Sequence, residues 1–331
     1  DKTLGNLFIS RENGAYQFEG VDNYYAGIPS YFRFNKSATG DPYYASAEFT
    51  GSFETLYVQD KYYVSDILTV NYGLRYDSFE MANGPAYNEY GSSLLGFRND
   101  TPASTSIVQP RFGFQLDATN LDMFSGDRVV AAEIRGGYGL FAGRVPNVWL
   151  ASPFANSGVV QYGSRTGRFA AGTPDCTTGA EITCFKAPET IYQDFPYSDY
   201  ASTSPAQAID PNYDTPSTWK LNLELLLTTA NGYDLKLAYN RDEAKDGVGF
   251  SDASASVEQV GKTGVVTYDS EGAYYITNGP GASSDSITLS LDKEFDNGVS
   301  VFASYTGLDA ENAWNGTSSQ LSSNLEYNPR V

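Results

Sequence analysis

The chain has 331 residues, enough for about ten to twelve strands with their loops, and it is rich in Gly and Tyr. Its 40 acidic and 21 basic residues give a formal net charge of −19, which excludes nucleic acid as a partner because two polyanions repel each other. The chain contains no histidine, so Ser-His-Asp triads, Cys-His pairs and histidine metal sites are excluded and no enzymatic activity is predicted.

Alternating polar and apolar residues, bounded by turn residues, predict about eleven strands. In chain order the predicted strands span 3–10, 15–20, 54–64, 67–77, 109–117, 129–141, 216–228, 233–243, 285–295, 299–307 and 319–328.

Short and long connections largely alternate between these strands. The shorter ones follow the first, third, fifth, seventh and ninth strands, and three of them carry the hairpin signal Asn-Gly, at Asn13-Gly14, Asn231-Gly232 and Asn297-Gly298. The longer ones span 21–53, 78–108, 142–215, 244–284 and 308–318. In an up-and-down meander every second connection lies at the same end. The pattern therefore predicts tight turns at one end and long loops at the other, which is typical of an outer-membrane barrel with extracellular loops.

The two faces of the strands differ in charge. Along Leu68–Asp77 the residues Val70, Tyr72 and Leu74 share one face, while Arg75 and Asp77 share the other. Across the clearest strand segments, the apolar face carries no charge. The polar face carries the charges that we expect to line a water-filled lumen: Arg75, Arg111, Glu133, Arg135, Lys220, Glu224 and Lys236.

A charge facing lipid at the bilayer midplane costs up to about 2–4 kcal/mol, which explains an uncharged face. The predicted fold class is therefore all-β: an antiparallel up-and-down meander that forms part of a transmembrane β-barrel. The alternative is a soluble antiparallel sandwich, which needs a second sheet to cover the apolar face and gives no reason for loops of alternating length.

The long loop 142–215 is rich in aromatic residues. Loops of this length are usually functional or disordered, and aromatic residues argue against simple disorder. Two interpretations remain open, namely capture of a ligand at the cell surface and packing of the loop on its neighbours. The candidate ligand-binding aromatics are Trp149, Phe154, Tyr162, Tyr192, Tyr197 and Tyr200.

Two cysteines, Cys176 and Cys184, lie in the same loop. Without histidine partners they make a poor metal site, so we predict a disulfide that closes a small loop in an oxidising compartment. No cofactor and no metal site are predicted. Acidic loops such as that containing Asp242, Glu243 and Asp246 could bind calcium, but the sequence has no calcium-loop motif.

Several motifs resemble those of a known family. Tyr57–Lys61 followed by Leu68–Asp77 resembles the "Y-x-Q-D … L-T-x-x-x-G-L-R-Y-D" hairpin of TonB-dependent outer-membrane receptors, and Pro110–Phe114 resembles their "P-R-x-G" strand. Similarity to the Oar-like subgroup is carried by Ile134–Phe141, Gly143–Pro146, Gly316–Ser319 and Ser322–Asn324.

This resemblance implies a barrel of about 22 strands around an N-terminal plug, energised from the inner membrane through TonB. No plug precedes the first predicted strand and no TonB box is visible, so we expect residues 1–331 to be a barrel-region fragment with about half of the strands. The implied partners are outer-membrane lipid, the plug, TonB and an extracellular ligand, and the implied location is the bacterial outer membrane.

The expected function is uptake of a ligand too large for general porins. Two alternatives from other classes remain, namely a surface structural or adhesion barrel without transport, and a soluble secreted β-protein that binds carbohydrate.

Overall fold

The computed structural model describes residues 2–7, 14–25, 31–124, 126–165, 203–260, 266–279, 281–311 and 321–325. The Cys176–Cys184 disulfide and the aromatic residues Tyr192, Tyr197 and Tyr200 lie outside these ranges, so they remain predictions.

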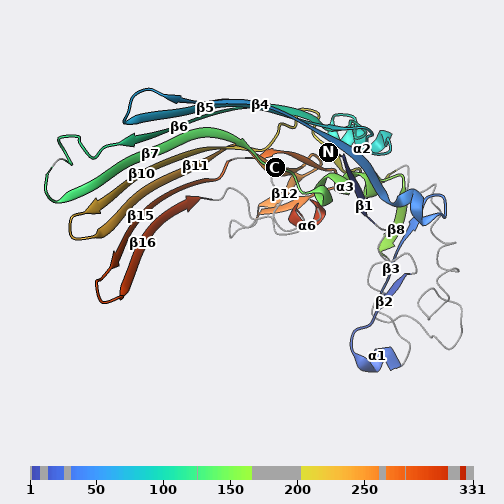
Figure 1. The fold of residues 1–331 in the computed structure, drawn as a ribbon. Helices are drawn as coiled ribbons and strands as arrows, with labels where there is room; N and C mark the ends of the chain where they lie inside the picture. The colour runs from blue at the N-terminus through green and yellow to red at the C-terminus, as the bar shows by residue number, and fades with distance from the viewer. Residues whose placement is uncertain are drawn as a thin grey trace, which may run out of the picture.

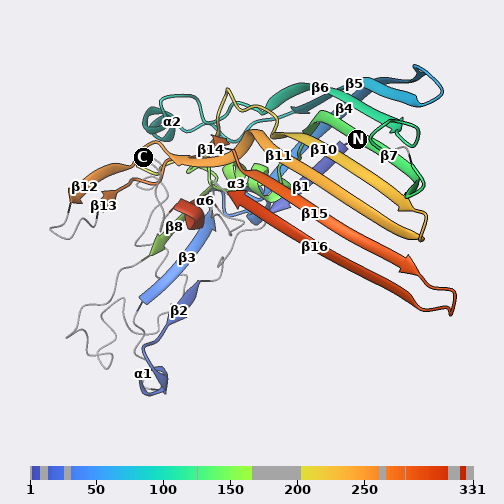
Figure 2. The ribbon, with the colours of Figure 1, turned by 90° about the vertical axis from the view of Figure 1, so that its left-hand side faces the viewer.

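Eight long strands form one continuous antiparallel sheet that follows the order of the chain. The sheet curves into an arch, which Figures 1 and 2 show from two directions. This arrangement confirms the predicted all-β meander as an open part of a barrel. The strands are β4 (Ala47–Tyr63), β5 (Leu68–Met81), β6 (Ser104–Asp117), β7 (Val129–Ala142), β10 (Ser217–Thr229), β11 (Tyr233–Asp252), β15 (Ser283–Glu294) and β16 (Ser300–Glu311).

Four of the shorter connections lie together at one end of the arch, on the left in Figure 1, and we call this the turn end. They join β4 to β5, β6 to β7, β10 to β11 and β15 to β16, as the alternation of loop lengths predicts. Both Asn-Gly turns in this group have the left-handed glycine that the signal implies, with φ of 70° at Gly232 and 81° at Gly298. Gly298 N–H donates to the carbonyl of Phe295 at 2.9 Å and closes its turn.

Replacing Gly298 with alanine should lower the free energy of unfolding by about 1 kcal/mol, because an L-residue is strained at positive φ. Gly307→Ala is the matched control, since Gly307 has no positive φ and an added Cβ there meets nothing within 4 Å. The measurement is the denaturant midpoint of each variant in lipid vesicles. Equal midpoints would show that the turn does not require its left-handed glycine.

The opposite end of the arch, which we call the loop end, contains the short elements. β1 (Lys2–Leu7) pairs with the first residues of β4, and β2 (Ala15–Gln17), β3 (Tyr31–Ser37) and β8 (Gln161–Arg165) form a separate sheet. β12 (Ser256–Val260) pairs with β13 (Val266–Asp269), and β14 (Tyr274–Gly279) joins β11 to β9 (Ala208–Ile209). The helical elements are α1 (Val21–Tyr25), η1 (Pro42–Ala45), α2 (Glu89–Leu95), α3 (Asn147–Ala155) and α6 (Leu321–Leu325). No helix in the described part of the chain has the length and apolar character needed to cross a membrane.

Two sequence predictions were wrong at this end. The predicted strands 3–10 and 15–20 do not pair with each other, because β1 pairs with β4 and β2 pairs with β3. The predicted strand 319–328 contains a helix, α6, whose Leu321 and Leu325 are both buried. A spacing of four residues returns to the same side in a strand and in a helix, so alternation could not separate the two structures.

The convex face of the arch is apolar and exposed. Phe112, Leu237, Leu289 and Tyr305 all point outward with about half or more of their surface accessible. Asp60 is an exception that was not predicted. Its register partner is Tyr72, so the Asp60 carboxylate lies on this same apolar face. The Tyr72 hydroxyl donates to Asp60 Oδ2 at 3.1 Å, so the carboxylate on this face has a local hydrogen-bond partner.

Candidate functional site on the concave face

The concave face carries the charges that the sequence assigned to a lumen. Glu224 on β10 is the centre of one group, since its carboxylate lies 2.6 Å from Arg135 Nε on β7 and 2.6 Å from Lys236 Nζ on β11. Glu133 lies 3.8 Å from Arg135 Nη1, and Lys220 Nζ lies 2.8 Å from Asp242 Oδ2. These side chains come together because strand alternation directs them to the same face and the antiparallel register places them side by side.

Replacing Glu224 with glutamine should lower the free energy of unfolding by about 1–3 kcal/mol, because it leaves two cations facing each other without their shared anion. The Glu224 side chain is 12% exposed, so water only weakly screens the attraction between its carboxylate and the two cations. The control with the same charge change is Asp242→Asn, whose pair with Lys220 is more exposed and should contribute less than about 1 kcal/mol. Denaturant titration of both variants in lipid vesicles measures the difference; equal losses would contradict a special role for Glu224.

A second group lies nearer the loop end and centres on Asp77. This carboxylate accepts hydrogen bonds from Thr55 Oγ1 at 2.7 Å and Gln109 Nε2 at 2.5 Å, and it lies 2.9 Å from Arg75 Nη2. Gln109, which is buried, accepts from Arg111 Nη2 at 3.2 Å through its amide oxygen. The group therefore links β4, β5 and β6 through side chains.

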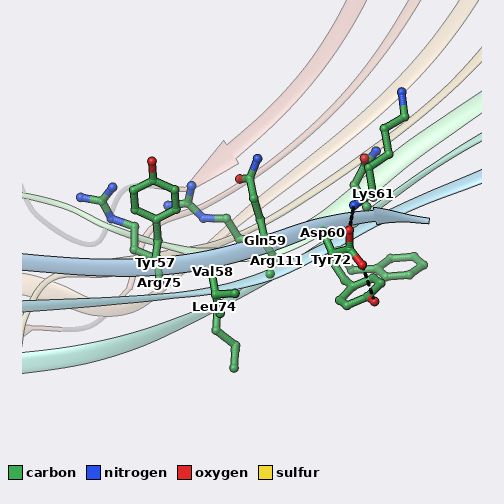
Figure 3. A pocket seen from close by; sticks show the side chains of 13 residues that line it. Tyr57, Val58, Gln59, Asp60, Lys61, Tyr72, Leu74, Arg75 and Arg111 are labelled. Atoms are coloured by element: carbon green, nitrogen blue, oxygen red, sulfur yellow. Dashed lines mark hydrogen bonds between the residues drawn. The ribbon is translucent and has the colours of Figure 1, made fainter.

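Between these two groups the concave face is hollowed. Two shallow cavities of about 660 and 690 Å³ lie there, and glycines Gly73, Gly113, Gly137 and Gly139 form part of their walls. Figure 3 shows the first cavity, with Tyr57, Gln59 and Lys61 on one side of the strand and Val58 and Leu74 on the other. A glycine leaves space where a side chain would project, so this part of the face remains open to water or to another chain.

The loop end of the concave face is covered by a hydrophobic core. Phe49 and Met81 from the sheet pack with Leu150 and Phe154 from α3, and Phe250 belongs to the same cluster. Figure 1 shows α3 and α6 beneath the arch, and we call this covering the cap. The cap forms because the loops bring apolar side chains over strand residues that face inward.

The structure places three of the predicted ligand-binding aromatics in contact with other aromatic rings. Phe154 stacks on Phe49 with ring centroids 5.6 Å apart. Trp149 meets Phe250 edge to face at 5.1 Å, and Tyr162 meets Phe34 in the same way at 6.1 Å. Phe154 is buried, so at this residue the loop packs on its neighbours, which is the second of the two interpretations left open by the sequence.

Four residues that shape the site were not among the predicted site residues, although Asp77 was already placed beside Arg75 on the polar strand face; they are Asp77, Gln109, Arg144 and Tyr213. Asp77 and Gln109 had a usable signal, because their alternation places them on the face of Arg75 and Arg111. Arg144 and Tyr213 lie in the long loop, where no periodic pattern predicts position. Within the described ranges, no group of three or more acidic or cysteine side chains is arranged to hold a metal ion.

Comparison with solved structures finds similarities at low sequence identity, including the following two. The siderophore receptor PirA from Pseudomonas aeruginosa is 9% identical, with a TM-score of 0.34, and the match covers 85% of this chain and 45% of that chain. The RagAB peptide importer in its "closed-closed" state is 10% identical, with a TM-score of 0.32, and the match covers 85% of this chain and 31% of that chain. The chain thus spans less than half the length of either protein. A search of curated proteins finds no match.

A family model described as "Outer membrane beta barrel domain" matches residues 4–330, which is nearly the whole chain. The meander, its apolar convex face and its charged concave face agree with that description. The chain therefore belongs to the outer membrane beta barrel domain family and is located in the bacterial outer membrane.

Proposed function

We propose that the chain is part of the barrel region of a TonB-dependent receptor that imports a ligand too large for general porins. The observation that carries this proposal is the cap. Packed side chains from the sheet and the loops cover the concave face at the loop end, next to an ion-paired polar surface. An open diffusion pore needs a clear aqueous path, whereas a receptor needs a structured end that admits only its ligand.

The charged concave face supports the same proposal. The ion pairs around Glu224 and Asp77 hold the face in a defined shape, while the glycine-walled cavities leave room beside them. A plug domain within the barrel would contact this surface. The resemblance to the Oar-like subgroup, carried by Ile134–Phe141 and Gly143–Pro146, remains a finer prediction within this proposal.

The test uses the full-length protein, purified in detergent, and the purified periplasmic domain of TonB from the same bacterium. We expect saturable binding by isothermal titration calorimetry, and no binding by an outer-membrane porin used as the control. A second measurement is ion conductance in planar bilayers, which should be low because the lumen is occupied.

Steady conductance without any binding of TonB would contradict the proposal and favour a structural or adhesion barrel. Membership of the outer-membrane family argues against the soluble carbohydrate-binding alternative.

A further inference from the structure

A smaller cavity of about 210 Å³ lies where the charged concave face meets the cap. Three guanidinium groups and one carboxylate line it, those of Arg75, Arg111, Arg144 and Asp77, so its lining has a net charge of +2. The chain as a whole has a net charge of −19, which makes a positive cavity an unusual local feature. We call this cavity the arginine pocket.

The carboxylate of the arginine pocket, that of Asp77, already has three partners within the protein. Asp77 accepts hydrogen bonds from Thr55 and Gln109 in addition to its ion pair with Arg75. It therefore neutralises Arg75 and has little capacity left for the other two arginines. In the described part of the chain, Arg111 is linked to Asp77 through the neutral amide of Gln109.

Arg111 and Arg144 are held in position by aromatic rings. The guanidinium of Arg111 lies 4.5 Å from the ring centroid of Phe141, and that of Arg144 lies 4.8 Å from that of Phe53. Among the described residues, neither has a carboxylate within 4.0 Å. A guanidinium has five N–H donors in a planar fork that matches a carboxylate, so both arginines retain donors for an anion.

The arginine pocket continues into a small apolar cavity of about 40 Å³ under the cap. The two cavities share Phe53, Phe79, Gly143, Arg144 and Thr215, so together they have a cationic mouth and an apolar extension.

Tyr213 lines the apolar extension, and its side chain carries a second observation. Tyr213 is 6% exposed, and its hydroxyl has no hydrogen-bond partner in the described part of the chain. Leaving a buried hydroxyl unpaired costs about 1–3 kcal/mol, so such a group points to a missing partner. Burial raises the pKa of Tyr213 above its usual value, so the hydroxyl stays protonated and available as a donor.

We propose that the arginine pocket binds a small organic acid, with its carboxylate on Arg111 and Arg144, its apolar body against Phe53 and Phe79, and a polar group at Tyr213. As the substrate class of an importer this assignment rests on the proposed function. The binding itself needs neither TonB nor an energised membrane, so its failure and the failure of the proposed function are separate results.

The experiment titrates full-length protein in detergent with benzoate, 4-hydroxybenzoate and benzyl alcohol, using isothermal titration calorimetry at fixed ionic strength. Benzoate should bind, and benzyl alcohol, which has no carboxylate, should bind about tenfold or more weakly. The double variant Arg111→Gln with Arg144→Gln should weaken benzoate binding by about tenfold or more. The double variant Arg98→Gln with Arg128→Gln has the same charge change outside the pocket and should bind benzoate as the unaltered protein does.

Tyr213→Phe provides a second arm that removes one hydroxyl and keeps the ring. It should weaken binding of 4-hydroxybenzoate severalfold and leave binding of benzoate unchanged, because only the former offers a partner to Tyr213. Absence of benzoate binding to the unaltered protein would overturn the proposal. Equal weakening of benzoate binding by the two double variants would also overturn the proposal, because the weakening would then follow from the change in net charge alone.

Discussion

Replacing Leu289 with arginine should prevent most of the protein from inserting into a bilayer. Leu289 lies near the middle of β15, is 54% exposed on the convex face, and faces Leu237 and Tyr305 on the neighbouring strands. An arginine at the midplane of the lipid-facing surface costs roughly 2–4 kcal/mol, because its charge leaves water for hydrocarbon. The expected loss is a large share of the total stability of an ordinary domain.

The control for this variant is Thr288→Arg, one residue along the same strand on the concave face, where the register partners Ala238 and Thr306 are uncharged. It adds the same side chain and the same charge, but it faces the hydrated side of the sheet. We expect it to insert like the unaltered protein. The measurement is the fraction of urea-unfolded protein that folds into lipid vesicles, determined by heat-modifiable electrophoresis. Equal insertion of the two variants would contradict the assignment of the convex face to lipid.

The sheet was predictable from the sequence because its cause is local. Each strand separates two solvents, so its side chains alternate in polarity, and Leu68–Asp77 shows this without any neighbouring strand in view. The turns at Gly232 and Gly298 were predictable for a related reason, because Asn-Gly specifies the turn by its own backbone preferences. Both signals require information from fewer than about twelve adjacent residues.

Asp60 marks the limit of that reasoning. The same alternation places it on the apolar face beside Val58, yet the prediction of an uncharged face used only the clearest segments. Its partner, Tyr72, belongs to the next strand and becomes visible only when the register is known. A pattern read along one strand therefore predicts the face of a residue but not its partner.

The cap could not be predicted because its contacts are distant in sequence. α3 contains Pro153, and its N-cap residue Pro146 makes no side-chain capping bond, so the segment has weak helix signals of its own. The helix is held by burial of Leu150 and Phe154 against the sheet. β9 has two residues and pairs with β14 from more than sixty residues later, which no local pattern indicates.

Phe154→Ala should destabilise the cap more than any single substitution at its surface. Phe154 is 7% exposed and stacks on Phe49 of β4 with an interplanar angle of 27°. Removing a buried ring of this kind costs roughly 3–5 kcal/mol, through lost apolar burial and the cavity left behind. The sheet keeps its strand hydrogen bonds, so the loss should appear as local opening of the cap.

Hydrogen exchange measures that local opening directly. In Phe154→Ala the amides of α3 and β14 should exchange faster, while the amides of β5 and β6 near the turn end should keep their protection. Tyr43→Ala, which removes an aromatic ring that is 78% exposed at the same end of the molecule, should leave all of them unchanged. A ring that holds the cap together must change the protection of the cap amides when it is removed. If Phe154→Ala instead left exchange in the cap unaltered and weakened capture of a ligand, Phe154 would be a ligand contact.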